Sequence, residues 1–269
     1  MSTNLRPSRV LREMRAGQLS TLYKINLSDP RVAEIAAREG ASALWLCNEH
    51  VPNDWLNLEN QIRAAALHDT DAIVRVAKGS YSDYIRPLEA GAAGIMVPHV
   101  ATEGEAYQAV KWTRFHPLGQ RPMDGGNADG GYATINTQDY VSFSNREKLL
   151  ILQIESPEAL ENVDAIAAVE GFDLLMFGPG DYAHLIGKAG NINDPEVVAA
   201  RRRVESAALE NGKRCVAVAV PGTPEELLSR GYSLVHTGAD VVSLNQGLKA
   251  ALEPYHTHSE PNKSDSLYG

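Results

Sequence analysis

The sequence predicts a single α/β domain folded as a (β/α)8 barrel. Eight short apolar runs of β type alternate with helical segments along the 269 residues. Several of these runs are apolar on both faces, as the strands of a buried parallel sheet are. A chain of this length is ordinary for one such barrel and can bury a full core. A doubly wound open sheet is the alternative, because periodicity alone cannot show that a sheet closes.

The predicted strands are short and evenly distributed. They span residues 19–25, 43–47, 72–76, 94–98, 149–155, 174–178, 215–220 and 241–244. The helices between them begin at residues typical of N-caps, or with proline in the first turn. These starts lie at Asp29, Asn53, Ser80, Thr102, Asp194 and Thr223. No composition break divides the chain, so we predict one domain over residues 1–254.

Two segments depart from the alternation of strands and helices. Residues 115–145 are rich in Gly, Asn, Asp and aromatic residues and carry no strong apolar period. A loop this long in a compact domain is usually a lid, a subunit contact or a disordered segment. Since it follows the fourth predicted strand, we expect it near the active-site face. Residues 255–269 form a polar tail, in which His256 and His258 are more typical of a solvated tail than of a metal site.

Composition excludes some classes of partner. The net charge of −9 and a pI near 5.4 provide no basic patch for nucleic acid or for an anionic membrane. No apolar run approaches the length of a transmembrane helix, and the charged N-terminal region lacks a signal-peptide core. Cys47 and Cys215 lie in apolar runs, which favours reduced, buried thiols and a cytoplasmic protein.

The strongest functional pattern lies between residues 149 and 182. Glu155 and Asp181 follow successive predicted strands of one βαβ unit, whose strand ends lie on the same edge of a sheet. Gln153 shares a strand face with Glu155. Two carboxylates and an amide suit a hard divalent cation that keeps open water positions. Taken singly, Glu155 and Asp181 could instead be capping residues of the helices that follow them.

Other strand ends supply polar residues at the same edge. His50 could act as a general base or acid near neutral pH, or could make a structural hydrogen bond. Arg75 interrupts an apolar strand and therefore needs a partner, either an acid such as Glu89 or an anionic substrate. Lys24 could form a Schiff base with a carbonyl substrate, which is an alternative route to the same carbanion. Further candidates are His99 and His184.

Several of these segments together resemble the HpcH/HpaI family of metal-dependent class II pyruvate aldolases. They are GAAGIMVPHV, EHVPND, the isolated Arg75 and the block QIESPEALENVDAIAAVEGFDLLMFGPGDY. The resemblance covers residues 16–252, and its most specific part is the spacing of QIE and GPGD. It implies a TIM barrel of the phosphoenolpyruvate/pyruvate type, forming a homo-oligomer, a hexamer or trimer, with terminal helices exchanged between subunits.

The resemblance also implies roles for individual residues. Glu155 and Asp181 match carboxylate ligands of Mg2+, Mn2+ or Co2+, and Gln153 matches a glutamine beside the metal waters. Arg75 faces the keto oxygen, and backbone N–H groups near Gly180 and Asp181 hold the substrate carboxylate. His50 matches the histidine of proton transfer, and Glu89 an acid after the third helix. The cation and Arg75 then stabilise an enolate. We predict reversible cleavage of a 4-hydroxy-2-oxo acid to pyruvate and an aldehyde.

Two departures from the family pattern affect the aldehyde half of the site. The family commonly has aspartate where Cys47 stands, and Cys47 cannot orient His50 as a carboxylate does, so Glu49 is an alternative partner. The Gly-x-Arg-Gly loop appears as Gly119-Gln120-Arg121-Pro122.

Three alternative functions remain open: a CoA-ester lyase, a 2-oxo acid decarboxylase, and a catalytically silent barrel that binds a small acid. The first would need a basic surface, which is absent beyond Arg201, Arg202 and Arg203.

Overall fold

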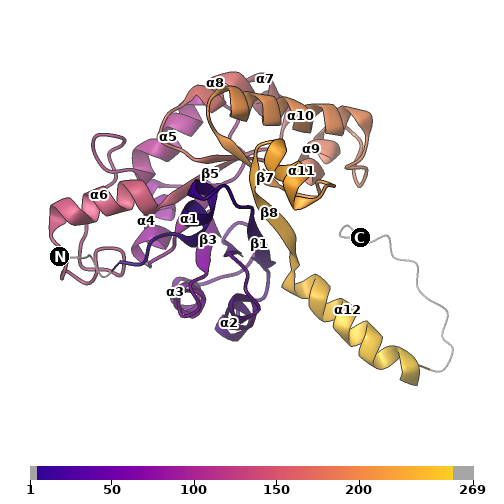
Figure 1. The fold of residues 1–269 in the computed structure, drawn as a ribbon, viewed down its shortest axis with the longest axis horizontal. Helices are drawn as coiled ribbons and strands as arrows, with labels where there is room; N and C mark the ends of the chain where they lie inside the picture. The colour runs from indigo at the N-terminus through magenta and orange to yellow at the C-terminus, as the bar shows by residue number, and fades with distance from the viewer. Residues whose placement is uncertain (1–4, 257–269) are drawn as a thin grey trace.

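Eight parallel strands close into a barrel in chain order, with β8 hydrogen-bonded back to β1. This computed structural model describes residues 5–256 (Figure 1). Helices follow the strands and cover the outside of the sheet. The predicted (β/α)8 barrel is confirmed, and the open-sheet alternative is wrong because the β1–β8 pairing removes both sheet edges.

The elements are numbered along the chain. The strands are β1 Ser20–Ile25, β2 Ala43–Cys47, β3 Asp71–Arg75, β4 Gly94–Val97, β5 Leu149–Ile154, β6 Leu174–Phe177, β7 Arg214–Ala217 and β8 Tyr232–Ala239. The helices are α1 Arg9–Arg15, α2 Pro30–Arg38, α3 Trp55–Ala66, α4 Tyr81–Glu89, α5 Glu103–Thr113, α6 Thr137–Glu147, α7 Pro157–Glu161, α8 Val163–Ala168, α9 Pro179–Leu185, α10 Pro195–Glu210, α11 Pro224–Ser229 and α12 Asp240–Leu252. A 3-10 turn, Glu253–Tyr255, follows α12.

The barrel interior is filled by one apolar cluster. This cluster takes residues from all eight strands and from α1, but from no other helix. Two other clusters contain the alternate strand residues together with the inner faces of the helices. Because side chains alternate along a strand, an interior position predicts where the residue two places further along the strand will point. That rule places the polar residues at the carboxyl ends of the strands inside the barrel mouth.

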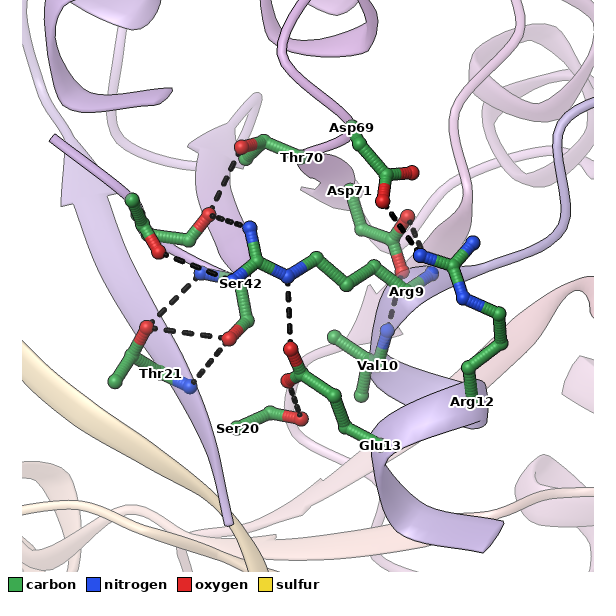
Figure 2. Close-up of polar contacts among 12 residues, drawn as sticks. Arg9, Val10, Arg12, Glu13, Ser20, Thr21, Ser42, Asp69, Thr70 and Asp71 are labelled. Atoms are coloured by element: carbon green, nitrogen blue, oxygen red, sulfur yellow. Dashed lines mark hydrogen bonds and ion pairs between the residues drawn. The ribbon is translucent and has the colours of Figure 1, made fainter. Parts of the chain in front are cut away.

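Helix α1 closes the amino-terminal end of the barrel. Its Val10 and Leu11 belong to the interior cluster. Buried Asp71, at the start of β3, accepts hydrogen bonds from Ser8 Oγ at 2.6 Å and from the Val10 amide at 2.9 Å. Arg9 contributes its backbone N–H, and the Arg6 guanidinium lies 2.8 Å from the same carboxylate. Figure 2 shows Asp71 beside Arg9 and Val10. These contacts hold α1 in place as the barrel floor.

The eighth predicted strand is wrong. Residues 241–244 lie in α12, and the true β8 is Tyr232–Ala239. Residues 232–239 were hidden because Ser233, His236, Thr237 and Gly238 interrupt their apolar character. The sequence VVSL looks like a strand, but a short apolar run cannot be distinguished from part of a helix by composition. The predicted helix starts hold, except that Asp54 rather than Asn53 caps α3.

Residues 115–145 are not one long loop. Helix α6 begins at Thr137, with the Asn136 side chain as its cap. The segment also lies at the amino-terminal end of the barrel, because α5 first carries the chain back along the outside. Asp129 forms ion pairs of 2.7 Å with Arg121 and with Lys148, which directly precedes β5. The expectation that this segment borders the active-site face is therefore wrong.

Three further expectations concern the cysteines, the tail and membrane insertion. Cys47 and Cys215 are free and buried, as predicted. Most of the predicted tail, residues 257–269, lies outside the described residues. Within residues 5–256, no helix combines the length and apolar character needed to cross a membrane.

The Asp71 network predicts a large effect of a small substitution. Asp71→Asn keeps the shape of the side chain but replaces one acceptor oxygen with an NH2 donor, which faces the α1 amides and Ser8. We expect the free energy of unfolding to fall by about 3 kcal/mol, as for a broken buried ionic network. Chemical denaturation measures this loss.

Asp69→Asn is the matched control for that measurement. Asp69 also pairs with Arg6 and Arg12, but its side chain is 51% exposed. An exposed pair contributes less than about 1 kcal/mol, so this variant should unfold almost as the wild type does. Equal losses from the two substitutions would show that Asp71 does not hold α1 in place.

Candidate functional site

A layer of polar side chains lies directly above the apolar interior at the carboxyl ends of the strands. Arg75 follows interior Ile73 by two residues, and Gln153 follows interior Ile151 in the same way. Arg75, Gln153 and Glu155 are all buried. The strand alternation that packs the core therefore also places these groups together.

Glu155 is the most deeply placed acid of this layer, with a side chain that is 2% exposed. Its Oε1 accepts a 2.7 Å hydrogen bond from the His99 amide, and His99 Nδ1 lies 3.2 Å away. Gln153 Nε2 donates to Oε2 at 3.3 Å. Gly178 makes room for the carboxylate, since a Cβ there would lie 2.6 Å from Oε2.

The electrostatic environment of Glu155 opposes its ionisation. Burial raises the pKa of the Glu155 carboxyl above its ordinary value. The nearby negative charges of Asp181 and Glu49 raise this pKa further, against the opposing effects of the His99 amide and imidazole. A buried carboxylate with two acidic neighbours is favoured when a cation is present.

Asp181 lies in the first turn of α9, immediately after β6. Pro179 opens this helix behind the bend at Gly178, and the Asp181 side chain is exposed toward solvent. Its charge acts on Glu155, so the two acids share one neighbourhood as the βαβ spacing predicted. Gly180 precedes Asp181 in the same first turn, where backbone N–H groups are free to bind an anion.

These residues fit a hard divalent cation that retains water ligands. Within residues 5–256, no group of three or more His, Cys, Asp and Glu side chains is arranged around one metal position. Two carboxylates with waters and a substrate are, however, a usual ligand set for Mg2+. Gln153 Oε1 is buried and has no hydrogen-bond partner among the described residues. It provides a further acceptor beside such a cation and its waters.

Glu49 is the hub of the basic side chains in the mouth. Its carboxylate lies 2.9 Å from Arg75 Nε, 3.3 Å from His99 Nε2 and 3.5 Å from His50 Nε2. Arg75 thus has an acidic partner, but that partner is Glu49 rather than Glu89. Glu49 was expected only as an alternative partner of His50, because its contact with Arg75 of β3 depends on the conformation of the loop after β2, which the sequence does not reveal.

Cys47 positions the His50 backbone and the Arg75 guanidinium, and not the His50 imidazole. Its Sγ accepts from the His50 amide at 3.4 Å and from Arg75 Nη2 at 3.2 Å. The His50 side chain is 63% exposed and its contact in the site is with Glu49. The imidazole is therefore free to meet a substrate at the rim of the barrel.

His99 is more central than its place among the further candidates suggested. It bridges Glu155 and Glu49, and its backbone carbonyl accepts a 2.6 Å hydrogen bond from Lys78. Its φ of +50° is uncommon for a residue with a side chain and points to local constraint. Its position directly after β4 was the feature that could have identified it.

Glu89 and Arg121 do not belong to this site within one chain. Glu89 ends α4, and its carbonyl accepts from the amide of Asp129, which pairs with Arg121. Both residues therefore lie at the amino-terminal end of the barrel, and the length of β5 separates them from Glu155. Arg121 also bonds Tyr140 and Ser144, so it anchors α6 to the barrel. His184 is exposed on α9.

Comparison with known proteins identifies the family. Residues 20–246 match the HpcH/HpaI aldolase/citrate lyase family. The chain belongs to this family. It is accordingly an aldolase, a carbon–carbon lyase, as the family resemblance of the sequence led us to predict.

Relatives resemble the chain over nearly its whole length. A hydroxypyruvate/pyruvate aldolase of Pseudomonas aeruginosa is 31% identical and covers 97% of this chain and 98% of its own. A 2-keto-3-deoxy-L-rhamnonate aldolase of Salmonella gallinarum is 33% identical, covering 82% and 83%. The crystal structure of a family protein from Burkholderia cenocepacia J2315 superposes with a TM-score of 0.83 at 29% identity, covering 93% and 100%.

Replacing the buried cysteine tests its place in the site. Cys47→Asp would introduce a carboxylate beside Arg75 and the His50 amide, in competition with Glu49. We expect the pH dependence of aldolase kcat/KM to shift, because the charges around both histidines are redistributed. Rate measurements across pH, with Cys47→Ser as an uncharged control, test this. Superimposable profiles for both variants and the wild type would exclude Cys47 from the polar network of the site.

Proposed function

We propose that the chain reversibly cleaves a 4-hydroxy-2-oxo acid to pyruvate and an aldehyde, using a divalent cation held by Glu155 and Asp181. The observation that carries this proposal is the burial of Glu155 beside two other acids, within a mouth that also contains Arg75. Dependence on a divalent metal is typical of the family. Mg2+ is our first choice, with Mn2+ and Co2+ as alternatives, because the carboxylate and amide oxygens present suit hard cations.

The residues of the chain divide the reaction between them. The cation supplies Lewis-acid stabilisation of the negative charge that develops on the 2-oxo acid. Backbone N–H groups at Gly180 and Asp181 hold the substrate carboxylate at the α9 N-terminus. The Arg75 guanidinium, aligned by Glu49 and Cys47, donates to the keto oxygen and stabilises the enolate left when the C3–C4 bond breaks.

Proton transfer falls to His50. Its imidazole lies at the rim, next to Glu49, and would accept the proton of the C4 hydroxyl as the aldehyde leaves. In the direction of synthesis the same group returns the proton. His99 lies too close to Glu155 to be our first choice, since its Nδ1 is 3.2 Å from a proposed ligand oxygen.

Proton exchange on pyruvate tests the proposal without knowledge of the aldehyde. Wild-type protein with Mg2+ in D2O should exchange the pyruvate methyl protons, as followed by NMR, and a chelator should stop the exchange. Glu155→Gln should abolish it, because the substitution removes a ligand charge. Glu158→Gln, the same change on the exposed first turn of α7, is the control. Full exchange by Glu155→Gln would refute the assignment.

The same variant should also alter stability in a distinctive way. The folded-state pKa of Glu155 is raised, so the folded protein resists ionisation of this carboxyl. The free energy of unfolding therefore falls as pH rises through that pKa. Metal-free Glu155→Gln should therefore melt at or above the temperature of the wild type, with the larger gain at pH 8 than at pH 5. It should lose the Mg2+-induced stabilisation, which for the wild type amounts to about 2.7 kcal/mol at a hundredfold excess over Kd.

We also propose that the chain forms a homo-oligomer in which terminal helices are exchanged. Figure 1 shows α12 projecting away from the barrel instead of covering it. One helix face carries Leu244, Leu248 and Leu252, each about half exposed at 51%, 49% and 50%. A groove of about 660 Å³ between α2, β1 and the start of α12 is lined by Val32, Ile35 and Ala36, among others. A partner's α12 would cover this apolar surface, as a hexamer or trimer requires.

Leu248→Glu should disrupt that assembly. The charge would face an apolar groove, so we expect sedimentation velocity to show smaller species than for the wild type. Leu67→Glu places the same charge at an exposed position after α3 and is the control. A Leu248→Glu protein of unchanged mass would show that this face of α12 is not a subunit contact.

A further inference from the structure

The backbone of His99 lies between the carboxylate of Glu155 and a lysine that the proposed reaction does not use. The His99 amide donates to Glu155 Oε1 at 2.7 Å, and the His99 carbonyl accepts from Lys78 Nζ at 2.6 Å. Lys78 follows β3, His99 follows β4 and Glu155 follows β5, which are adjacent strands of the barrel. One loop residue therefore connects Lys78 to a proposed ligand of the cation.

His99 needs outside contacts to keep its conformation. Its φ of +50° lies in the left-handed region, which is unfavourable for a residue with a side chain and persists only where the surroundings fix it. The next amide, that of Val100, donates to the Gln153 carbonyl at 3.1 Å. The Lys78 ammonium holds the His99 carbonyl. Without Lys78, one of the contacts that fix His99 is lost, and the His99 amide is held less firmly toward Glu155.

Glu105 extends this contact to the start of α5. Its Oε1 lies 2.6 Å from Lys78 Nζ, and its Oε2 accepts from the Ala101 amide at 2.7 Å. Burial raises the pKa of Glu105, but the hydrogen bonds from Lys78 and from the Ala101 amide outweigh this effect and lower the pKa overall. The carboxylate is therefore ionised at neutral pH, and Lys78 and Glu105 together form a clamp on residues 99–101.

The clamp contributes little to the stability of the fold. The side chains of Lys78 and Glu105 are 33% and 35% exposed, and ion pairs this open to water stabilise proteins only weakly. Its effect on Glu155 is more specific, because both carboxylate oxygens are held: Oε1 by the His99 amide and Oε2 by Gln153 at 3.3 Å. Groups that hydrogen-bond a ligating carboxylate fix its orientation and increase the affinity for the metal.

We propose that Lys78 and Glu105 are positioning residues for the cation site: they fix the backbone of His99, whose amide holds Glu155 in the orientation that binds the ion. This inference rests on the proposed function, in which Glu155 is a ligand of the cation. It adds to that function two residues that contact neither the cation nor the substrate.

Cation binding by Lys78→Met tests the clamp. Removal of a positive charge near a cation site would by itself tighten cation binding, whereas loss of positioning weakens it, so the two effects have opposite signs. We expect the Kd for Mn2+, measured from the EPR signal of the free ion, to rise about tenfold. Lys78→Arg keeps donors for both acceptors and should stay within about threefold of the wild type. The melting temperature of metal-free Lys78→Met should change by less than about 2 °C.

Hydrogen–deuterium exchange tests the same contacts in the metal-free protein. The amides of residues 99–101 donate to Glu155, to the Gln153 carbonyl and to Glu105. In Lys78→Met they should exchange at least about tenfold faster than in the wild type, because the loop that the clamp fixes opens more readily. Mass spectrometry of the peptide that contains these residues measures the rate.

Lys188→Met is the matched control. The Lys188 side chain is 35% exposed and also pairs with acids, Asp194 and Glu196 at the start of α10. Among residues 5–256, Lys188 donates to no residue that touches Glu155. This variant should bind Mn2+ as the wild type does.

Two results would overturn the positioning role while leaving Glu155 a ligand. They are a Kd of Lys78→Met equal to or below that of the wild type, and unchanged exchange at residues 99–101. A wild type that binds no Mn2+ would instead refute the cation site itself, and the role of the clamp with it.

Discussion

The whole site depends on one buried carboxylate. Glu155 lies inside the barrel mouth beside Asp181 and Glu49, and its burial raises its pKa. Such an arrangement is unfavourable for the isolated fold, because like charges and desolvation both act against the ionised form. His99 offsets only part of this through its amide and imidazole. A bound cation would offset both effects, so the arrangement of these acids favours the binding of the ion that the chemistry needs.

The barrel can carry this cost because its two ends are specialised differently. At the amino end, Asp71 is as deeply buried as Glu155, yet it is fully satisfied by α1, and Asp129 is paired with Arg121 and Lys148. At the carboxyl end, several buried polar atoms have no protein partner among the described residues. The contrast separates stability from function: acids at the floor hold elements together, whereas those at the mouth remain available for ligands.

The sequence predicted the alternation of strands and helices and the placement of Glu155 and Asp181 at one edge of the sheet, because the strand period and the βαβ rule translate directly into positions in space. Closure of the sheet did not follow from periodicity and was supported by the number of strands and by the family resemblance. The sequence did not predict β8, whose polar residues interrupt the apolar pattern, or α6, whose cap lies within a glycine-rich segment. Glu89 was misplaced because helix length decides which end of the barrel a residue reaches. The role of Glu49 could not be derived, since the loops after β2 and β4 bring His50 and His99 to it, beside Arg75 at the end of β3.

The substitution of cysteine for aspartate at position 47 becomes intelligible in this setting. A carboxylate at Cys47 would lie beside Arg75 and would join Glu49 and Glu155 in a mouth already rich in acids. The thiol still accepts from Arg75 and from the His50 amide, so it contacts both groups without adding another carboxylate to the mouth.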